Sequence, residues 1–147
     1  MNFKDTDKNI SKYMERIAIP AIRISFAVIF FWFGILKPFG LSSAEPLLKA
    51  TVSWLPIGTP DIWLEIIGWW EVLIGITFLF KKTTKIAIGL LFLQMIGTFM
   101  PLVFLPEIAF QKGNYILPTL EGQYIIKNIM IISAALVVGG KFYRDKK

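Results

Sequence analysis

Glu71 and Lys127 lie inside long apolar stretches of this sequence, where a carboxylate and an ammonium could pair or take part in proton transfer. Glu71 lies midway along the apolar stretch 62–80, and Lys127 lies near the start of the apolar stretch 124–140. A charge in the hydrocarbon core of a membrane costs about 2.5–3.5 kcal/mol on insertion scales. Each charge must therefore be neutralised, paired or turned toward a polar cavity. A carboxylate and an ammonium satisfy this requirement most simply by pairing with each other.

The depth of each residue in its helix predicts a common polar site. At 1.5 Å per residue, Glu71 lies about 14 Å, Gln94 about 16 Å and Lys127 about 10 Å below the predicted outer ends of their helices. A lysine side chain is about 6 Å long, so these groups can meet in the outer half of the membrane. Three further polar side chains complete the predicted cluster: Asn128, Trp69 and Trp70.

The predicted pair of Glu71 and Lys127 has two interpretations. It is either a structural staple that fixes the register of two helices, or part of an outward-facing polar cavity for a small ligand, a quinone head group or protons. Gln94 has the same two interpretations, because a hydrogen bond between membrane helices can serve packing alone. No nucleophile, metal or phosphate motif accompanies these residues. We therefore expect no catalytic dyad, and the sequence leans against an enzyme.

Three more ionisable residues lie near the ends of the predicted membrane segments. Arg23 lies near the inner end of the first segment, where it is either a snorkelling anchor or part of a gate or lipid-phosphate site. Lys37 follows fourteen residues later, close to four helical turns, so the two cations share one face at opposite ends. Glu65 lies near the outer surface, where we expect a solvated interfacial role.

The elements that position these residues are four membrane-spanning helices. The chain has 147 residues, of which 55% are hydrophobic and 18% charged, and its mean hydropathy is +0.62. About 20 helical residues cross a membrane, and four stretches have this character: 17–36, 62–80, 86–105 and 124–140. We therefore predict an all-α integral membrane protein, a four-transmembrane-helix bundle that forms a single domain over residues 1–147.

The segments outside the spans carry local signals of their own. Residues 1–16 have an amphipathic helical pattern that runs into the first span. In the first outer connection, Ser42-x-x-Glu45 is a capping-box pattern that predicts a short interfacial helix ending at Pro56. Thr59-Pro60 offers an N-cap and a first-turn proline for the second span.

One face of the second span is suited to close helix packing. Gly68, Glu71 and Gly75 are spaced i, i+3 and i+7, so a carboxylate lies between two glycines on the same face. Small residues allow the backbone of a neighbouring membrane helix to approach closely.

The positions of the basic residues predict the orientation in the membrane. The net charge is +6. Eleven Lys and Arg lie before the first span, between spans two and three and after the fourth span, whereas three lie in the other two connections. This distribution predicts that both termini are cytoplasmic in a bacterial inner membrane. The basic excess is thus explained by topology and contact with the lipid bilayer, and we expect no nucleic-acid partner.

The chain contains neither cysteine nor histidine. The absence of cysteine excludes disulfides and thiolate chemistry. The absence of histidine removes the usual general base, the usual haem ligand and most zinc or copper sites. We therefore expect no metal or haem.

Several short motifs resemble one family of small membrane proteins. They begin with Ala21-Ile22-Arg23-Ile24-Ser25 and Phe31-Trp32-Phe33-Gly34-Ile35-Leu36-Lys37, and continue with Glu71-Val72-Leu73-Ile74-Gly75, Thr98-Phe99-Met100-Pro101-Leu102-Val103 and Gly122-Gln123-Tyr124-Ile125-Ile126-Lys127. In this order they resemble the YkgB-like inner-membrane family, which includes the reactive-chlorine-resistance protein RclC and lies near the DoxX-like families. The chain departs from that family at Asn128 and Pro38, and its first outer loop is shorter.

The resemblance implies a non-catalytic component of a redox or oxidative-stress system, with a quinone as candidate cofactor. Relatives of the DoxX-like type are associated with a thiosulfate:quinone oxidoreductase subunit, so a membrane redox subunit is a candidate partner. The alternative is a small oligomeric channel or transporter for protons or a small solute, since intramembrane charges occur in a chain too short to enclose a wide pore alone. A homo-oligomer is the partner that this alternative requires.

Overall fold

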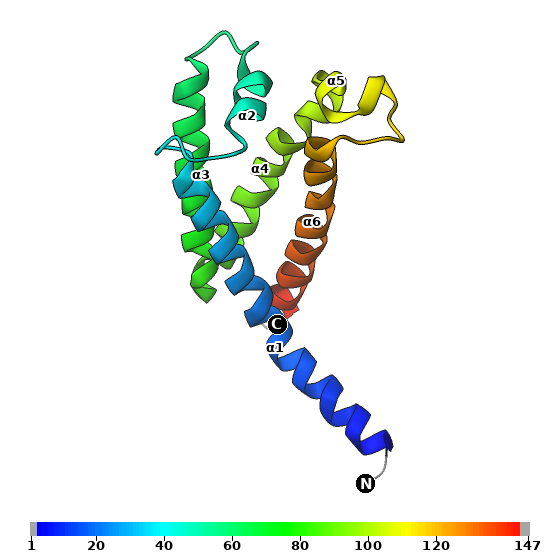
Figure 1. Cartoon of the computed structure of the whole chain (residues 1–147). Helices are drawn as coiled ribbons and strands as arrows, with labels where there is room; N and C mark the ends of the chain where they lie inside the picture. The colour runs from blue at the N-terminus through cyan, green and yellow to red at the C-terminus, as the bar shows by residue number, and fades with distance from the viewer. Residues whose placement is uncertain (1–2, 145–147) are drawn as a thin grey trace.

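Four long helices dominate the structure, a computed structural model that describes residues 3–144 (Figure 1). They are α1 (Phe3–Leu36), α3 (Pro60–Leu79), α4 (Thr84–Phe104) and α6 (Leu120–Arg144). Each is long and apolar enough to cross a membrane. Apart from one isolated bridge between Phe110 and Pro118, the described residues are helical or in loops. The predicted all-α, multi-pass membrane fold is confirmed.

The two ends of the bundle differ. One end, called here the loop end, carries the short helices α2 (Glu45–Val52), α5 (Pro106–Ala109) and η2 (Gln111–Gly113). The other end, called the terminal end, carries both ends of the chain and the tight turn η1 (Lys81–Thr83) (Figure 1). Helix α1 extends well beyond the bundle at the terminal end, because the amphipathic leader continues into the first span without a break.

The helix boundaries follow most of the local signals. Each predicted span lies within one helix to within a residue. Thr59 is the N-cap of α3, and its hydroxyl accepts a hydrogen bond from the amide of Ile62 at 3.4 Å. The short helix in the first connection is present as α2, but its predicted capping box is wrong. Ala44 is the N-cap, and the Ser42 hydroxyl instead accepts from the Ala44 amide at 3.3 Å.

Helices α1 and α3 pack closely because glycines line their contact. A Cβ added to Gly34 would lie 2.8 Å from the carbonyl oxygen of Gly68 and from Cβ of Glu71. A Cβ on Gly75 would lie 2.6 Å from the amide nitrogen of Phe31. The glycine face that the sequence predicts on α3 is therefore the surface that receives α1.

The remaining helices complete the bundle around an apolar core. Helix α4 packs on α3, α6 packs on α4, and α6 returns to α1 through a smaller contact. The core lies in the half of the bundle near the terminal end and includes these buried side chains: Phe26, Phe30, Ile74, Phe78, Ala87, Leu91, Met95 and Ala135. Helix α1 ends beside Gly68, so it does not reach the first two turns of α3. Near the loop end, α2 packs on α3 in its place.

Candidate functional site

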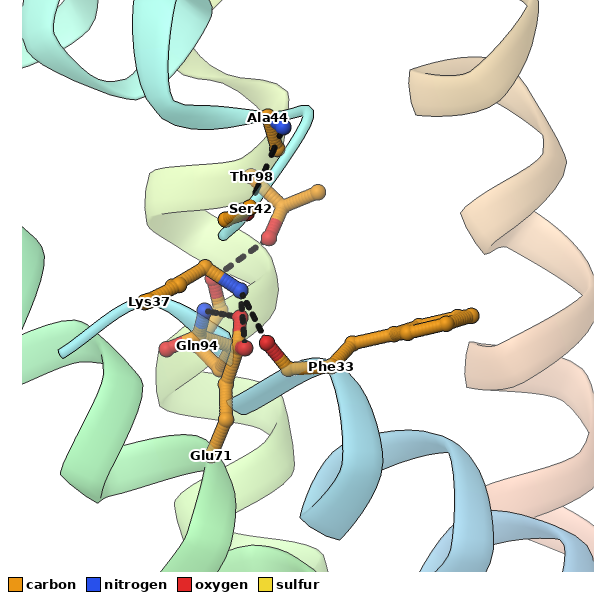
Figure 2. A network of polar contacts seen from close by, with 7 residues as sticks. All are labelled: Phe33, Lys37, Ser42, Ala44, Glu71, Gln94 and Thr98. Carbon is orange, nitrogen blue, oxygen red and sulfur yellow. Dashed lines mark hydrogen bonds and ion pairs between the residues drawn. The ribbon is translucent and has the colours of Figure 1, made fainter. Parts of the chain in front are cut away.

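The partner of Glu71 is Lys37, and the predicted pair of Glu71 with Lys127 is wrong. Lys37 follows the last residue of α1, and its ammonium forms an ion pair with Oε2 of Glu71 (Figure 2). The side chains of Lys37 and Glu71 are only 7% and 13% exposed. Removal of either partner would leave the other charge buried and alone.

Each member of the pair has a further hydrogen bond. The Lys37 ammonium also donates to the carbonyl of Phe33 at 3.3 Å, one turn back along α1. A cation at this position also interacts favourably with the negative end of the helix dipole. Oε1 of Glu71 accepts a bond from Nε2 of Gln94 at 3.0 Å. Both carboxylate oxygens are thus engaged, and Figure 2 shows the three side chains converging from the end of α1, from α3 and from α4.

Two further hydrogen bonds lie close to Gln94. The hydroxyl of Thr98 donates to the main-chain carbonyl of Gln94 within α4 at 3.1 Å. One turn toward the terminal end, the indole N–H of Trp70 donates to the carbonyl of Leu90 at 3.3 Å. We use the name polar cluster for Lys37, Glu71 and Gln94. The bonds from Trp70 to Leu90 and from Gln94 to Glu71 hold α4 against α3 at this level.

The polar cluster lies on the wall of a cavity of about 440 Å³ near the loop end. This loop-end cavity is enclosed mainly by α2, α3 and α4, and α6 contributes a single residue, Ile125. Most of its wall is apolar, including these side chains: Leu47, Leu48, Val52, Trp63, Ile66, Ile67, Trp70, Leu93, Met100 and Pro101. Besides the polar cluster, the hydroxyl-bearing residues are Thr51 and Thr98. The cavity therefore combines an apolar wall with one concentrated polar region.

Several residues predicted for the site lie elsewhere. Lys127 is exposed on α6, with its ammonium 5.2 Å from the centre of the Tyr124 ring. Asn128 donates to the carbonyls of Tyr124 and Ile125 in its own helix, at 3.0 and 3.1 Å. Trp69 is exposed and is not among the cavity residues, so only Trp70 of the two tryptophans lines it.

The helical rotation of α6 explains the error. Ile125 is buried and faces the cavity. Lys127 follows by two residues, or about 200° around the helix axis, so it faces away from the bundle. Positions along the helices do not fix their rotation about the axis. The helix ends also lie at different levels, since α1 ends beside Gly68 and thereby brings Lys37 within reach of Glu71.

The other two predicted ionisable residues lie outside the polar cluster. Glu65 is exposed on α3, and its solvated interfacial role stays a prediction. Arg23 is buried instead of reaching out to the headgroups, so the snorkelling interpretation is wrong. Its Nε and Nη2 donate to the carbonyl of Phe78 at 3.1 and 2.9 Å, which satisfies a free carbonyl in the last turn of α3. As predicted, Arg23 and Lys37 lie on one face of α1, since both contact α3.

The sequence contained a signal for the Lys37 partnership. Gly34 lies three residues before Lys37, and Gly68 lies three residues before Glu71. If these glycines mark one close crossing of antiparallel helices, Lys37 packs beside Gly68 and Glu71 beside Gly34, and the long lysine side chain spans the distance between them. The part played by α2 in closing the cavity had no comparable signal in its residues.

The chain was also compared with protein-family models, curated proteins and solved structures, and none of the three comparisons found a significant match.

Proposed function

We propose that this protein binds a small amphipathic molecule with a carbonyl-bearing head group, of the quinone class, as a non-catalytic component of a membrane redox or oxidative-stress system. The observation that supports this proposal is the position of the polar cluster on the wall of an otherwise apolar cavity. Small-molecule sites are typically apolar cavities of about 300–1,000 Å³ with a few placed polar groups, and about 440 Å³ lies within this range.

The polar cluster offers hydrogen bonds that suit a carbonyl ligand. An ammonium has three N–H groups, and the described contacts of Lys37 engage two of them. The amide of Gln94 has two N–H groups and a carbonyl, and the described contacts of its side chain engage one N–H. A quinone carbonyl would accept from Lys37 or Gln94, and the hydroxyl of the reduced form would donate to the Gln94 carbonyl.

The apolar wall suits the rest of such a ligand. Trp63 and Trp70 both line the loop-end cavity, and aromatic rings pack well against a flat ring system. Burial of an apolar tail against α2 and α4 adds favourable free energy in proportion to its area. The cluster has no nucleophile and no group of three metal-ligating residues among the described residues, so its role in the proposal is binding.

The alternative of a channel or transporter places different demands on the chain. Phe78, Ile74 and Leu91 are fully buried in the core that separates the loop-end cavity from the terminal end. A conduit would therefore have to run between subunits of an oligomer. The geometry of the single chain favours the binding function.

A matched pair of glycines on α4 tests the proposal. Gly97 lines the loop-end cavity and Gly89 does not, and an added Cβ at either meets nothing within 4 Å. Gly97→Leu should fill the cavity and abolish binding of a short-chain benzoquinone, measured by quenching of tryptophan fluorescence in detergent. Gly89→Leu should bind as the unmodified protein does. Equal binding by the two variants, or no binding by the unmodified protein, would refute the proposed function.

A further inference from the structure

A second cavity lies at the terminal end, remote from the polar cluster. It has a volume of about 510 Å³ and lies between residues 15–23 of α1, the start of α4 and the end of α6. Its charged lining residues are Arg16, Arg23, Lys81, Lys141 and Glu15. Four cationic side chains from three separate parts of the chain thus face one cavity, against one carboxylate. We call it the terminal-end cavity.

Arg23 gives this cavity a fixed donor group. Its guanidinium is buried and held on the Phe78 carbonyl through Nε and Nη2. A guanidinium has five N–H groups in a planar arrangement, and the described bonds of Arg23 leave Nη1 available. Because the bonds to Phe78 already fix the side chain, a ligand would bind it with little further loss of conformational entropy.

The terminal-end cavity lies at the level of a membrane interface. Lys81 belongs to the turn between two membrane-spanning helices, and Thr84 begins the second of them. Ile19 and Val138 lie about one turn deeper than Arg16 and Lys141, and Arg23 lies one turn deeper than Ile19. A group bound here would meet Arg16, Lys81 and Lys141 at headgroup level, apolar side chains below them, and Arg23 from the buried side. Basic cavities between membrane helices are suited to anionic headgroups.

We propose that the terminal-end cavity binds an anionic phosphate group, supplied either by the headgroup of an acidic phospholipid or by a soluble phosphate compound. Phosphate oxygens accept strong charge-assisted hydrogen bonds from guanidinium and ammonium groups. Arg16 and Lys81 would approach the phosphate from α1 and η1, and Arg23 from the buried side. A lipid-phosphate site is one of the interpretations that the sequence allows for Arg23, and the cavity supplies the other basic residues.

The test uses the full chain in a nonionic detergent. Native mass spectrometry compares binding of phosphatidylglycerol with that of phosphatidylcholine of the same acyl chains, and thermal stability is measured with inorganic pyrophosphate in a separate arm. We expect preferential binding of phosphatidylglycerol, pyrophosphate or both. Arg16→Gln and Lys81→Gln should each weaken binding about fivefold, equivalent to about 1 kcal/mol per basic residue. Binding of the lipid alone would identify a headgroup site, and binding of pyrophosphate alone a site for a soluble phosphate.

Lys82→Gln is the matched control, because it removes the same charge from the same turn but Lys82 does not line the cavity. It should weaken binding less than about twofold. Equal losses in Lys81→Gln and Lys82→Gln would show diffuse surface attraction and overturn the proposal. Equal binding of the two lipids without any effect of pyrophosphate would overturn it as well. Arg23 is left unchanged in these variants, so the fold keeps its bond to Phe78.

Discussion

The hydrogen bonds around Lys37 and Glu71 compensate for the burial of this ion pair. Glu71 contacts Lys37 through one oxygen and Gln94 through the other, and Lys37 is also bonded to the end of α1. A buried ion pair adds little stability compared with well-packed apolar residues, but loss of one partner is costly. The proposed ligand-binding role would account for a charged pair in an apolar wall, since the pair itself adds little stability.

The double substitution of the ion pair should cost less stability than the sum of the two single substitutions. Lys37→Met and Glu71→Leu should each lower the free energy of unfolding by about 3–5 kcal/mol, because each leaves an unpaired buried charge. The double variant should recover part of this loss, with an interaction energy above about 1 kcal/mol. Unfolding in mixed micelles titrated with sodium dodecyl sulfate measures these differences.

Lys127→Met is the control for that cycle. Since Lys127 is exposed and contacts Tyr124, its replacement should change the free energy of unfolding by no more than about 0.5 kcal/mol. Additive effects of Lys37→Met and Glu71→Leu, or strong coupling of Lys127 to Glu71, would contradict the ion pair described here.

At the scale of elements, the crossing of α1 and α3 determines which residues meet. The sequence predicts the four spans, the glycine face of α3 and the polar character of Glu71 and Gln94, because each depends on composition or spacing within one helix. The partner of Glu71 depends on the level and rotation of two helices relative to each other. Those quantities are set by tertiary packing, so hydropathy places Lys127 and Lys37 at approximate depths but does not choose between them.

A methyl group added between α1 and α3 should destabilise the bundle. A Cβ on Gly68 would lie 2.6 Å from Cδ of Pro38 and 2.9 Å from the carbonyl oxygen of Gly34. Gly68→Ala should therefore lower the free energy of unfolding by about 1–3 kcal/mol, as overpacking does. Gly89→Ala meets open space and should instead raise it by up to about 1 kcal/mol through helix propensity. A stabilising Gly68→Ala would argue against this helix crossing.

A charged link holds α2 on the start of α3, and it should depend on pH. Lys49 lies 2.5 Å from Asp61 and 2.7 Å from Glu45. Its hydrogen bonds to Asp61 and then to Glu45 raise the pKa of Lys49 above its ordinary value of 10.5. A raised pKa in the folded protein means that the stabilising contribution is complete below the ordinary value and is lost as the pH rises through the folded value.

Comparison with Lys49→Gln isolates this contribution. The unmodified protein should have the higher melting temperature at about pH 9, and the difference should shrink as the pH rises above the ordinary pKa of 10.5. A difference that persists at the higher pH would show that the ammonium is not responsible for holding α2.

At the scale of the whole molecule, the bundle is asymmetric in charge as well as in shape. Four spans place both chain ends at the terminal end, together with the turn η1. Lys37 is buried in its ion pair, so it is not one of the exposed basic residues of the loop-end connections. Lys49 and Lys112 then remain in the two loop-end connections, against the eleven basic residues that the sequence has before the first span, between spans two and three and after the fourth. This asymmetry strengthens the prediction that the terminal end is cytoplasmic.

The absence of cysteine from the sequence makes that orientation directly measurable. Ile116→Cys places a thiol in the second loop-end connection, where Ile116 is 84% exposed, and Lys82→Cys places one in the exposed turn η1. A membrane-impermeant maleimide should label Ile116→Cys in cells whose inner membrane is intact, and Lys82→Cys only after that membrane is permeabilised. The reverse pattern would place the terminal end outside. It would also show that the basic residues around the terminal-end cavity do not follow the charge rule for cytoplasmic loops.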